Sequence, residues 1–153
     1  MLLPPTYPSP QSLPSLREAR PSNQIHLLFW DQPIASGLQF LKTYNHAEIH
    51  QYSDRLLQRV APQDKFLHLH LHLDREIEDL RFLCQSCTQS MILLEGMDLL
   101  LTYLRVQQGS NITGFWKNLE LLTRLAVPLW LLLPFTLRPA KWPKERSLQI
   151  QSQ

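Results

Sequence analysis

Glu95 and Asp98 are the residues whose type and spacing suggest chemistry most directly. They follow an apolar run, residues 91–94, and Gly96 lies between them. An apolar run that ends in acidic residues is typical of a buried strand that brings a carboxylate to the magnesium ion of a bound nucleotide. The sequence contains no G-x-x-x-x-G-K-[ST] loop to hold the phosphates. We therefore expect Glu95 to end a strand at a solvent-facing crevice, and Asp98 to lie in the first turn of a helix, where the helix dipole favours a negative charge.

The segment after the first expected strand, residues 30–37, is also unsuited to phosphate. Phosphate-binding turns present glycine-rich backbone amides at a helix N-terminus. Here Asp31 would repel a phosphate, Pro33 removes a donor amide, and Gly37 falls inside the expected helix. Asp31 is instead predicted to cap that helix, with Pro33 in its first turn. We expect no nucleotide and no other cofactor.

His68, His70 and His72 alternate with leucines in residues 65–73. In a strand, this alternation puts the histidines on one face, with His68 and His70 about 7 Å apart at Cα. Two such imidazoles can share a metal ion, but zinc needs three or four ligands, so Glu95 or another residue would have to complete the site. The preferred interpretation is a polar sheet face that a helix, a loop or a partner protein covers.

The two cysteines, Cys84 and Cys87, have C-x-x-C spacing. They could supply thiolate ligands, but a helix also places residues i and i+3 on one side for packing, and cysteine is a common core residue. No metal is therefore expected. Two cysteines cannot form a disulfide framework, and the N-terminus lacks a secretory signal, so we expect a reducing, cytoplasmic compartment.

Short apolar runs that alternate with helical patterns indicate an α/β fold: a three-layer sandwich with a mainly parallel sheet of four to five strands. We predict strands over residues 24–30, 65–73, 91–94 and 127–133, and an edge strand at 147–150. Helices are predicted over residues 34–44, 49–60, 74–87, 97–107 and 115–125, with Asp74 as an N-cap. A short strand over residues 47–52 is the second-ranked alternative to the start of the helix at 49.

The chain has 153 residues, a hydrophobic fraction of 44% and a formal net charge of +2. This size suits one domain. Residues 1–23 contain six prolines and are expected to form a disordered arm, followed by a single α/β domain over residues 24–153. Lysine and arginine are scattered, which does not favour nucleic acid as a partner. No membrane is expected either, because the apolar run 125–133 is shorter than the roughly 20 residues of a span.

Three segments resemble the second half of bacterial STAND-type P-loop NTPase domains. They are residues 90–98, in which an apolar run ends at Glu95, residues 115–120, and residues 127–134, of the form P-L-hydrophobic-L-x-L-P. The resemblance extends over residues 24–137. Because the phosphate loop is missing, it implies an inactive, P-loop NTPase-like module of the kind that serves as an adaptor in bacterial signalling or conflict systems. Only Glu95 maps onto a functional position of the family.

The sequence thus predicts a non-catalytic protein-interaction or regulatory adaptor module whose partner is another protein. The expected contact surfaces are the proline-rich arm and the crevice at the strand ends, with Asp31, Asp74 and Glu95. Trp142 is a further candidate, because it lies between prolines and lysines in the C-terminal tail and suits an exposed contact anchor.

Two other functions stay open as alternatives. The first is a small metal-binding protein or enzyme that uses His68, His70 and Glu95. The second is an accessory nucleic-acid-binding subunit, which would use the basic residues of the C-terminal tail, Arg138, Lys141, Lys144 and Arg146.

Overall fold

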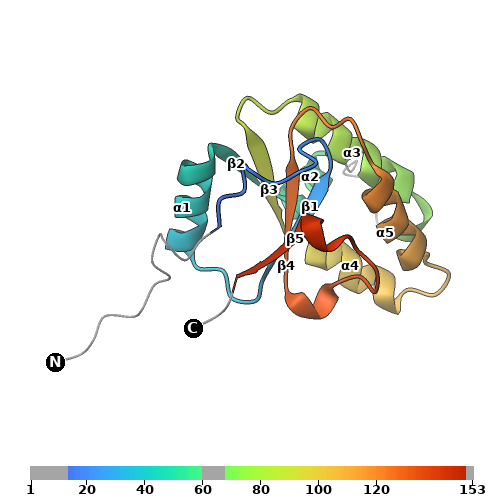
Figure 1. Ribbon diagram of the computed structural model, residues 1–153. Helices are drawn as coiled ribbons and strands as arrows, with labels where there is room; N and C mark the ends of the chain where they lie inside the picture. The colour runs from blue at the N-terminus through green and yellow to red at the C-terminus, as the bar shows by residue number, and fades with distance from the viewer. Residues whose placement is uncertain (1–13, 60–67, 151–153) are drawn as a thin grey trace.

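The computed structural model describes residues 14–59 and 68–150 and shows a three-layer α/β sandwich (Figure 1). Neighbouring strands of its five-stranded sheet are all parallel. The spatial order is β2-β3-β4-β1-β5, with the bounds β1 Ile25–Trp30, β2 Ala47–Gln51, β3 Met91–Glu95, β4 Leu129–Leu133 and β5 Ser147–Ile150. The predicted fold class is confirmed, as are the strands expected at 24–30, 91–94, 127–133 and 147–150.

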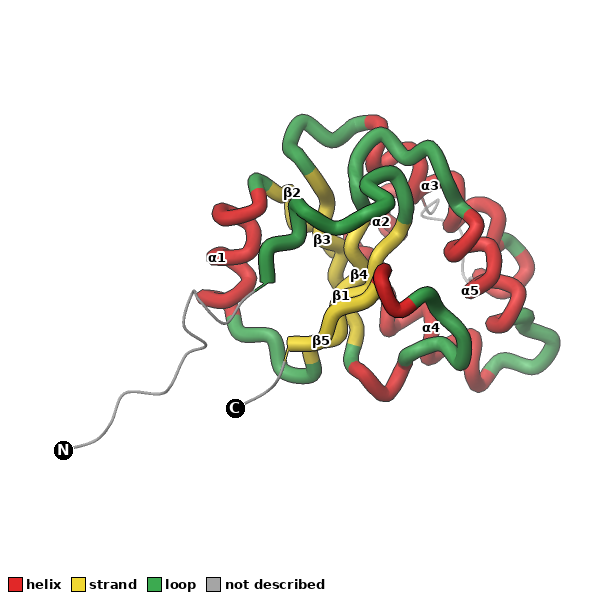
Figure 2. Tube along the Cα trace, viewed as in Figure 1, coloured by secondary structure: helices red, strands yellow, loops and turns green. Residues whose placement is uncertain are grey.

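Helices cover both faces of this sheet (Figure 2). The helix α1 lies on one face, whereas α3, α4 and α5 lie on the other. Tyr52 of α2 packs into the same hydrophobic core as α3, α4 and α5. The bounds are α1 Ala35–Asn45, α2 Tyr52–Arg59, α3 Leu73–Gln85, α4 Met97–Val106 and α5 Ile112–Leu121.

Strand β1 is buried along its whole length, which explains its continuous apolar sequence. Successive side chains of a strand point to opposite faces of the sheet. Ile25, Leu27 and Phe29 therefore pack into the core beneath α3, α4 and α5, and Leu28 and Trp30 pack into the core beneath α1. This central strand thus contributes side chains to both hydrophobic cores.

Residues 14–23 belong to the folded domain. Leu16 is fully buried in the core beneath α1, and its backbone amide donates a hydrogen bond of 2.8 Å to Oδ1 of Asn45. Asn45 in turn donates through Nδ2 to the carbonyl of Leu41 at 3.0 Å. Burying a leucine stabilises a fold by about 2 kcal/mol. The predicted arm therefore does not extend to residue 23, and residues 1–13 lie outside the described residues.

His26 ties residues 14–23 to the sheet. It is fully buried on β1, its ring stacks on Trp130 with 4.8 Å between centroids, and Nε2 donates to the carbonyl of Pro21 at 2.7 Å. Burial lowers the pKa of His26, because desolvation disfavours the charged ring and outweighs the hydrogen bond to Pro21. The imidazole is therefore neutral at neutral pH and acts as a hydrogen-bonding core residue.

Residues 47–51 form a strand rather than the start of a helix. After α1, His46 takes a left-handed conformation with a φ of 52°, and β2 then pairs with β3 from Ala47↔Met91 to Gln51↔Glu95. The first-ranked prediction, a helix from residue 49, is wrong, and the second-ranked strand is correct. Pairing with a buried strand overrides the helical spacing of the apolar residues here.

The predicted histidine-rich strand is wrong over residues 68–73, and residues 65–67 lie outside the described part of the chain. Leu69–Leu71 form a 3₁₀ turn, and α3 begins at Leu73. Leu69 and Leu73 pack against the core, whereas Leu71 is 63% exposed. The two leucines that pack against the core are therefore four residues apart, as on one side of a helix, and the leucines do not alternate with histidines across the two faces of a strand.

Two helix starts also differ from the prediction. The N-cap of α3 is His72, so Asp74 lies exposed in the first turn and is not the cap. Helix α5 begins at Ile112 rather than at residue 115, because Asn111 caps it by accepting a hydrogen bond of 2.9 Å from the amide of Gly114. Within residues 14–59 and 68–150, no helix is long and apolar enough to cross a membrane.

Replacing Leu16 with alanine tests the place of residues 14–23 in the fold. We expect Leu16→Ala to lower the free energy of unfolding by about 3 kcal/mol, as for other fully buried leucines, in urea denaturation. Glu18→Ala, at an exposed position of the same segment, should change it by less than about 0.5 kcal/mol. A Leu16→Ala protein as stable as the wild type would show that these residues contribute nothing to the core.

Candidate functional site

A crevice opens at the carboxyl ends of β1, β2, β3 and β4, where open α/β sheets bind their ligands. Its volume is about 340 Å³, and we refer to it as the strand-end crevice. The structure brings Asp31 and Glu95, two of the predicted contact residues, together there. The lining residues are Trp30, Asp31, Pro33, Gln51, Glu95, Gly96, Asp98, Leu132, Leu133 and Pro134.

Asp31 joins the ends of two strands instead of capping a helix. Its Oδ1 accepts a hydrogen bond of 2.8 Å from the amide of Phe135, just after β4. The N-cap of α1 is Ile34, which makes no side-chain cap bond. The predicted helix cap at Asp31 is therefore wrong, because the carboxylate satisfies an amide across the crevice and thereby fixes the turn that follows β4.

Glu95 and Asp98 are positioned by the turn between β3 and α4. Nε2 of Gln51, the last residue of β2, donates to Oε2 of Glu95. Gly96 has a φ of 88°, and a Cβ at this position would lie 3.4 Å from the backbone nitrogen of Tyr52. Glycine is the residue that adopts this conformation without strain. Asp98 follows in the first turn of α4, as predicted.

The crevice is acidic. Asp31, Glu95 and Asp98 line it, and its described lining includes no lysine, arginine or histidine. Carboxylates that share one concave site repel an anion and attract a cation. The charge of the crevice thus disfavours a phosphate group and favours an ammonium or guanidinium group.

A second concave surface, which we call the apolar groove, lies between α2, α4 and the turn at Leu69–Leu71. Its volume is about 360 Å³. Leu57 is 72% exposed and Leu99 is 60% exposed, and Leu71 of the adjoining turn is also exposed. The lining residues are Tyr52, Ser53, Leu56, Leu57, Leu69, Leu99, Leu100 and Tyr103.

The apolar groove was not predicted from the sequence, although a signal was present. Leu99, Leu100 and Leu101 are consecutive in α4, and three consecutive residues of a helix cannot all face one core. Leu100 and Leu101 are buried and Leu99 is exposed. Leu56 and Leu57 divide in the same way on α2, since Leu56 packs against the core and Leu57 faces solvent.

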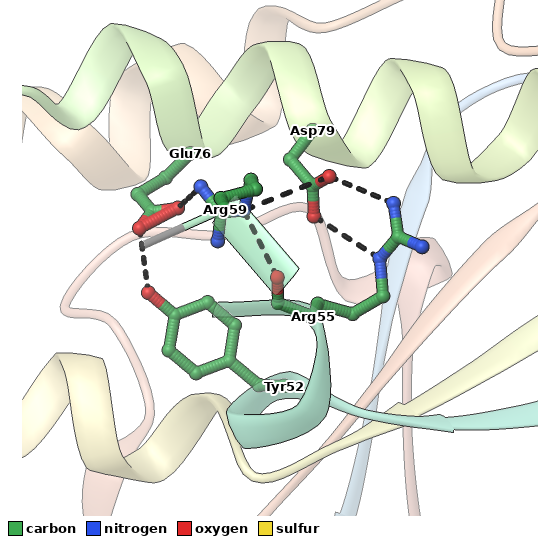
Figure 3. Close-up of polar contacts among 5 residues, drawn as sticks. All are labelled: Tyr52, Arg55, Arg59, Glu76 and Asp79. Carbon is green, nitrogen blue, oxygen red and sulfur yellow. Dashed lines mark hydrogen bonds and ion pairs between the residues drawn. The ribbon is translucent and has the colours of Figure 1, made fainter. Parts of the chain in front are cut away.

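An ion-pair cluster joins α2 to α3 (Figure 3). Because residues of α2 line the groove, this cluster helps to hold one of its walls in place. Arg55 forms a two-point pair with Asp79, with 2.7 Å from Nη2 to Oδ1 and 3.3 Å from Nε to Oδ2. Arg59 lies between Glu76 and Asp79 of α3, with Nη1 2.6 Å from Oε2 of Glu76 and Nε 3.7 Å from Oδ1 of Asp79. Planar, two-point arginine–carboxylate pairs fix geometry as well as charge.

Tyr52 anchors the start of α2 to the same cluster. Its hydroxyl donates a hydrogen bond of 2.8 Å to Oε1 of Glu76, and both side chains are buried. Burial raises the pKa of Tyr52, and the negative charge of Glu76 raises it further. Burial alone would lower the pKa of Arg59, but the hydrogen bond and the charge of Glu76 raise it. The phenol therefore stays protonated and the guanidinium stays charged.

A carboxylate–histidine pair on β2 contacts the loop before β3. Oε1 of Glu48 lies 3.0 Å from Nε2 of His50, and Oε2 accepts a hydrogen bond of 2.7 Å from the amide of Thr88. Burial alone would raise the pKa of Glu48, but the hydrogen bonds from Thr88 and His50 outweigh it and lower the pKa to about 2. The ionised carboxylate therefore stabilises the loop before β3 through its hydrogen bond from Thr88.

Within the described residues, the structure does not group the residues of the predicted metal alternative into one site. Nδ1 of His70 is 2.8 Å from the hydroxyl of Tyr103, and the rings of His68 and His70 lie 6.1 Å apart. Burial raises the pKa of Cys84 to about 12, so its thiol stays protonated. Glu95 lines the strand-end crevice. Over residues 14–59 and 68–150, no three histidine, cysteine or acidic side chains are grouped so that they could hold a metal ion.

The remaining predicted contact residues lie away from the crevice. Asp74 is exposed on α3. Trp142 is half-buried, with its ring edge against Trp116 and its Nε1 donating to the carbonyl of Arg146 at 3.1 Å. Arg146 is itself buried, and it donates to the carbonyls of Ile25 and Glu120. Of the basic tail residues, Arg146 therefore has a structural role.

No protein-family model matches this chain, and no curated protein is significantly similar to it in sequence.

The hydroxyl of Tyr52 provides a test of the ion-pair cluster. We expect Tyr52→Phe to lower the free energy of unfolding by about 1.5 kcal/mol, because a buried carboxylate oxygen of Glu76 loses its donor. Tyr44→Phe is the matched control, since Tyr44 is 44% exposed and its ring stacks on Phe40. Equal stability of the two variants in chemical denaturation would show that the bond to Glu76 contributes nothing to holding α2.

Proposed function

We propose that this protein is a non-catalytic protein-interaction module, an adaptor built on an inactive, P-loop NTPase-like α/β fold. The main support for the proposal is the apolar groove, where the exposed Leu57 of α2 and Leu99 of α4 line a concave apolar surface together with the half-buried Leu69 of the turn before α3. Contiguous exposed apolar surface of this kind marks protein-binding sites, because its burial against a partner removes it from water.

The chemistry of the strand-end crevice supports the non-catalytic part of the proposal. The segment that would have to hold phosphate contains Pro33, and Asp31 is committed to the amide of Phe135. Glu95 stands at the end of β3, as the STAND resemblance implies, but it is bonded to Gln51. These features support the proposal that the protein has the fold of an NTPase but does not bind or hydrolyse a nucleotide.

The cellular setting follows from the same proposal. The STAND resemblance implies a bacterial protein, and Cys84 and Cys87 are both free thiols. Free thiols fit a reducing compartment, so we place the adaptor in the cytoplasm.

The nucleotide question has a direct test. We expect ATP with magnesium to leave the thermal unfolding midpoint unchanged in a thermal shift assay, because the crevice is acidic. A ligand present at about 100 times its Kd would stabilise the protein by about 2.7 kcal/mol, which corresponds to a rise of about 5 to 10 °C for a chain of this size. A rise of that size would contradict the inactive-fold part of the proposal.

Charged substitutions in the apolar groove test the interaction function. Proteins captured from the source organism by the wild type would be identified by mass spectrometry, purified and titrated calorimetrically. We expect Leu57→Glu and Leu99→Glu to weaken binding of the captured partner at least tenfold, since each places a charge in the buried contact (a loss of about 1.4 kcal/mol or more).

Leu121→Glu is the matched control. Leu121 is a leucine of α5 that is 61% exposed and does not line the apolar groove. A partner that binds all three variants as it binds the wild type, or that loses affinity equally with all three, would remove the groove as the interaction site.

A further inference from the structure

The apolar groove and the strand-end crevice adjoin at two places and make up one composite surface. At the start of α4, Asp98 lines the crevice and the next residue, Leu99, lines the groove. At the junction of β2 and α2, Gln51 lines the crevice and Tyr52 lines the groove. Consecutive residues are about 3.8 Å apart at Cα, so the linings of the two parts meet at both places.

The two parts differ in chemistry. The described lining of the groove contains no ionised side chain, whereas the crevice lining contains Asp31, Glu95 and Asp98. The arginines of α2, Arg55 and Arg59, are paired with the acids of α3 and do not offset the charge of the crevice. The surface therefore runs from apolar to acidic.

We infer that this surface binds a basic amphipathic helix of a partner protein, with apolar side chains in the groove and a lysine or arginine in the crevice. Amphipathic helices that dock into apolar grooves use anchors at i, i+3, i+4 and i+7, so that one face is apolar and the flanks are free to carry charge. Charge complementarity selects a basic partner segment over an acidic one. The inference rests on the proposed function and adds the chemistry of the partner.

Synthetic peptides test this inference before the natural partner is identified. The first probe is a fluorescein-labelled helical peptide with leucines on one face and lysines elsewhere. The second has glutamate in place of lysine at the same spacing. The third has the composition of the first in an order that forms no apolar face. We expect fluorescence anisotropy to show that the full-length protein binds the leucine–lysine peptide at least tenfold more tightly than either other peptide.

Variants of the protein separate the two parts of the surface. A Glu95→Gln, Asp98→Asn double variant should bind the leucine–lysine peptide about tenfold more weakly, and added salt should reduce the difference. Glu18→Gln, Glu78→Gln is the matched control, because it removes two exposed carboxylates outside the crevice. A Leu57→Ser, Leu99→Ser double variant should also weaken binding about tenfold.

Each contrary outcome has a distinct meaning. If both amphipathic peptides bind equally and both depend on Leu57 and Leu99, the basic partner is refuted while the interaction function stands. If no peptide binds, or if Leu57→Ser, Leu99→Ser changes nothing, this docking surface is refuted, and capture of the natural partner decides the proposed function separately. A concentration-dependent dimer in sedimentation that the leucine variant abolishes would show that a second copy occupies the groove, and would also overturn the inference.

Discussion

Parallel pairing of β1 with β4 and β5 is the constraint on which the rest of the molecule depends. Because β1 is buried on both faces, the sheet requires a helical layer on each side, and the chain supplies α1 for one and α3, α4 and α5 for the other. Because the strands are parallel, their carboxyl ends meet at one edge. That edge brings Asp31, which follows β1, into one crevice with Glu95 and Asp98, which lie much further along the chain at the end of β3 and the start of α4.

The same constraint explains which parts of the fold could be predicted. A strand that is buried on both faces is apolar throughout, so β1, β3 and β4 were recognisable as short apolar runs bounded by polar residues or prolines. The acids that follow such runs must lie at the common edge, and this reasoning placed Asp31 and Glu95 correctly. It did not reveal that Asp31 bonds to Phe135, because the path of the chain after β4 depends on tertiary packing.

The wrong secondary-structure predictions fall in segments whose apolar residues fit both the two-residue period of a strand and the three- or four-residue spacing of a helix. In residues 68–73 leucine recurs every second residue, but the structure packs Leu69 and Leu73 against the core, and α3 begins at Leu73. In β2 the reverse occurs, since an edge strand exposes Glu48 and His50 in part and so lacks a continuous apolar run. The burial of Leu16 was not predicted for another reason. A single leucine in a proline-rich segment has no periodic pattern that marks it as a core residue, and its position depends on a long-range hydrogen bond from its amide to Asn45.

Helix α2 links stability to the proposed binding surface. It has eight residues, and a helix of that length is not stable alone in water. Its position therefore depends on contacts to the rest of the fold, which include the packing of Tyr52 and Leu56 into the core and the pairing of Arg55, Arg59 and Tyr52 with Glu76 and Asp79 of α3. The polar face of α2 is used in this cluster, which leaves Leu57 directed to solvent beside Leu99 of α4. Leu57 and Leu99 together expose apolar surface, and the partner that we propose would remove this surface from water.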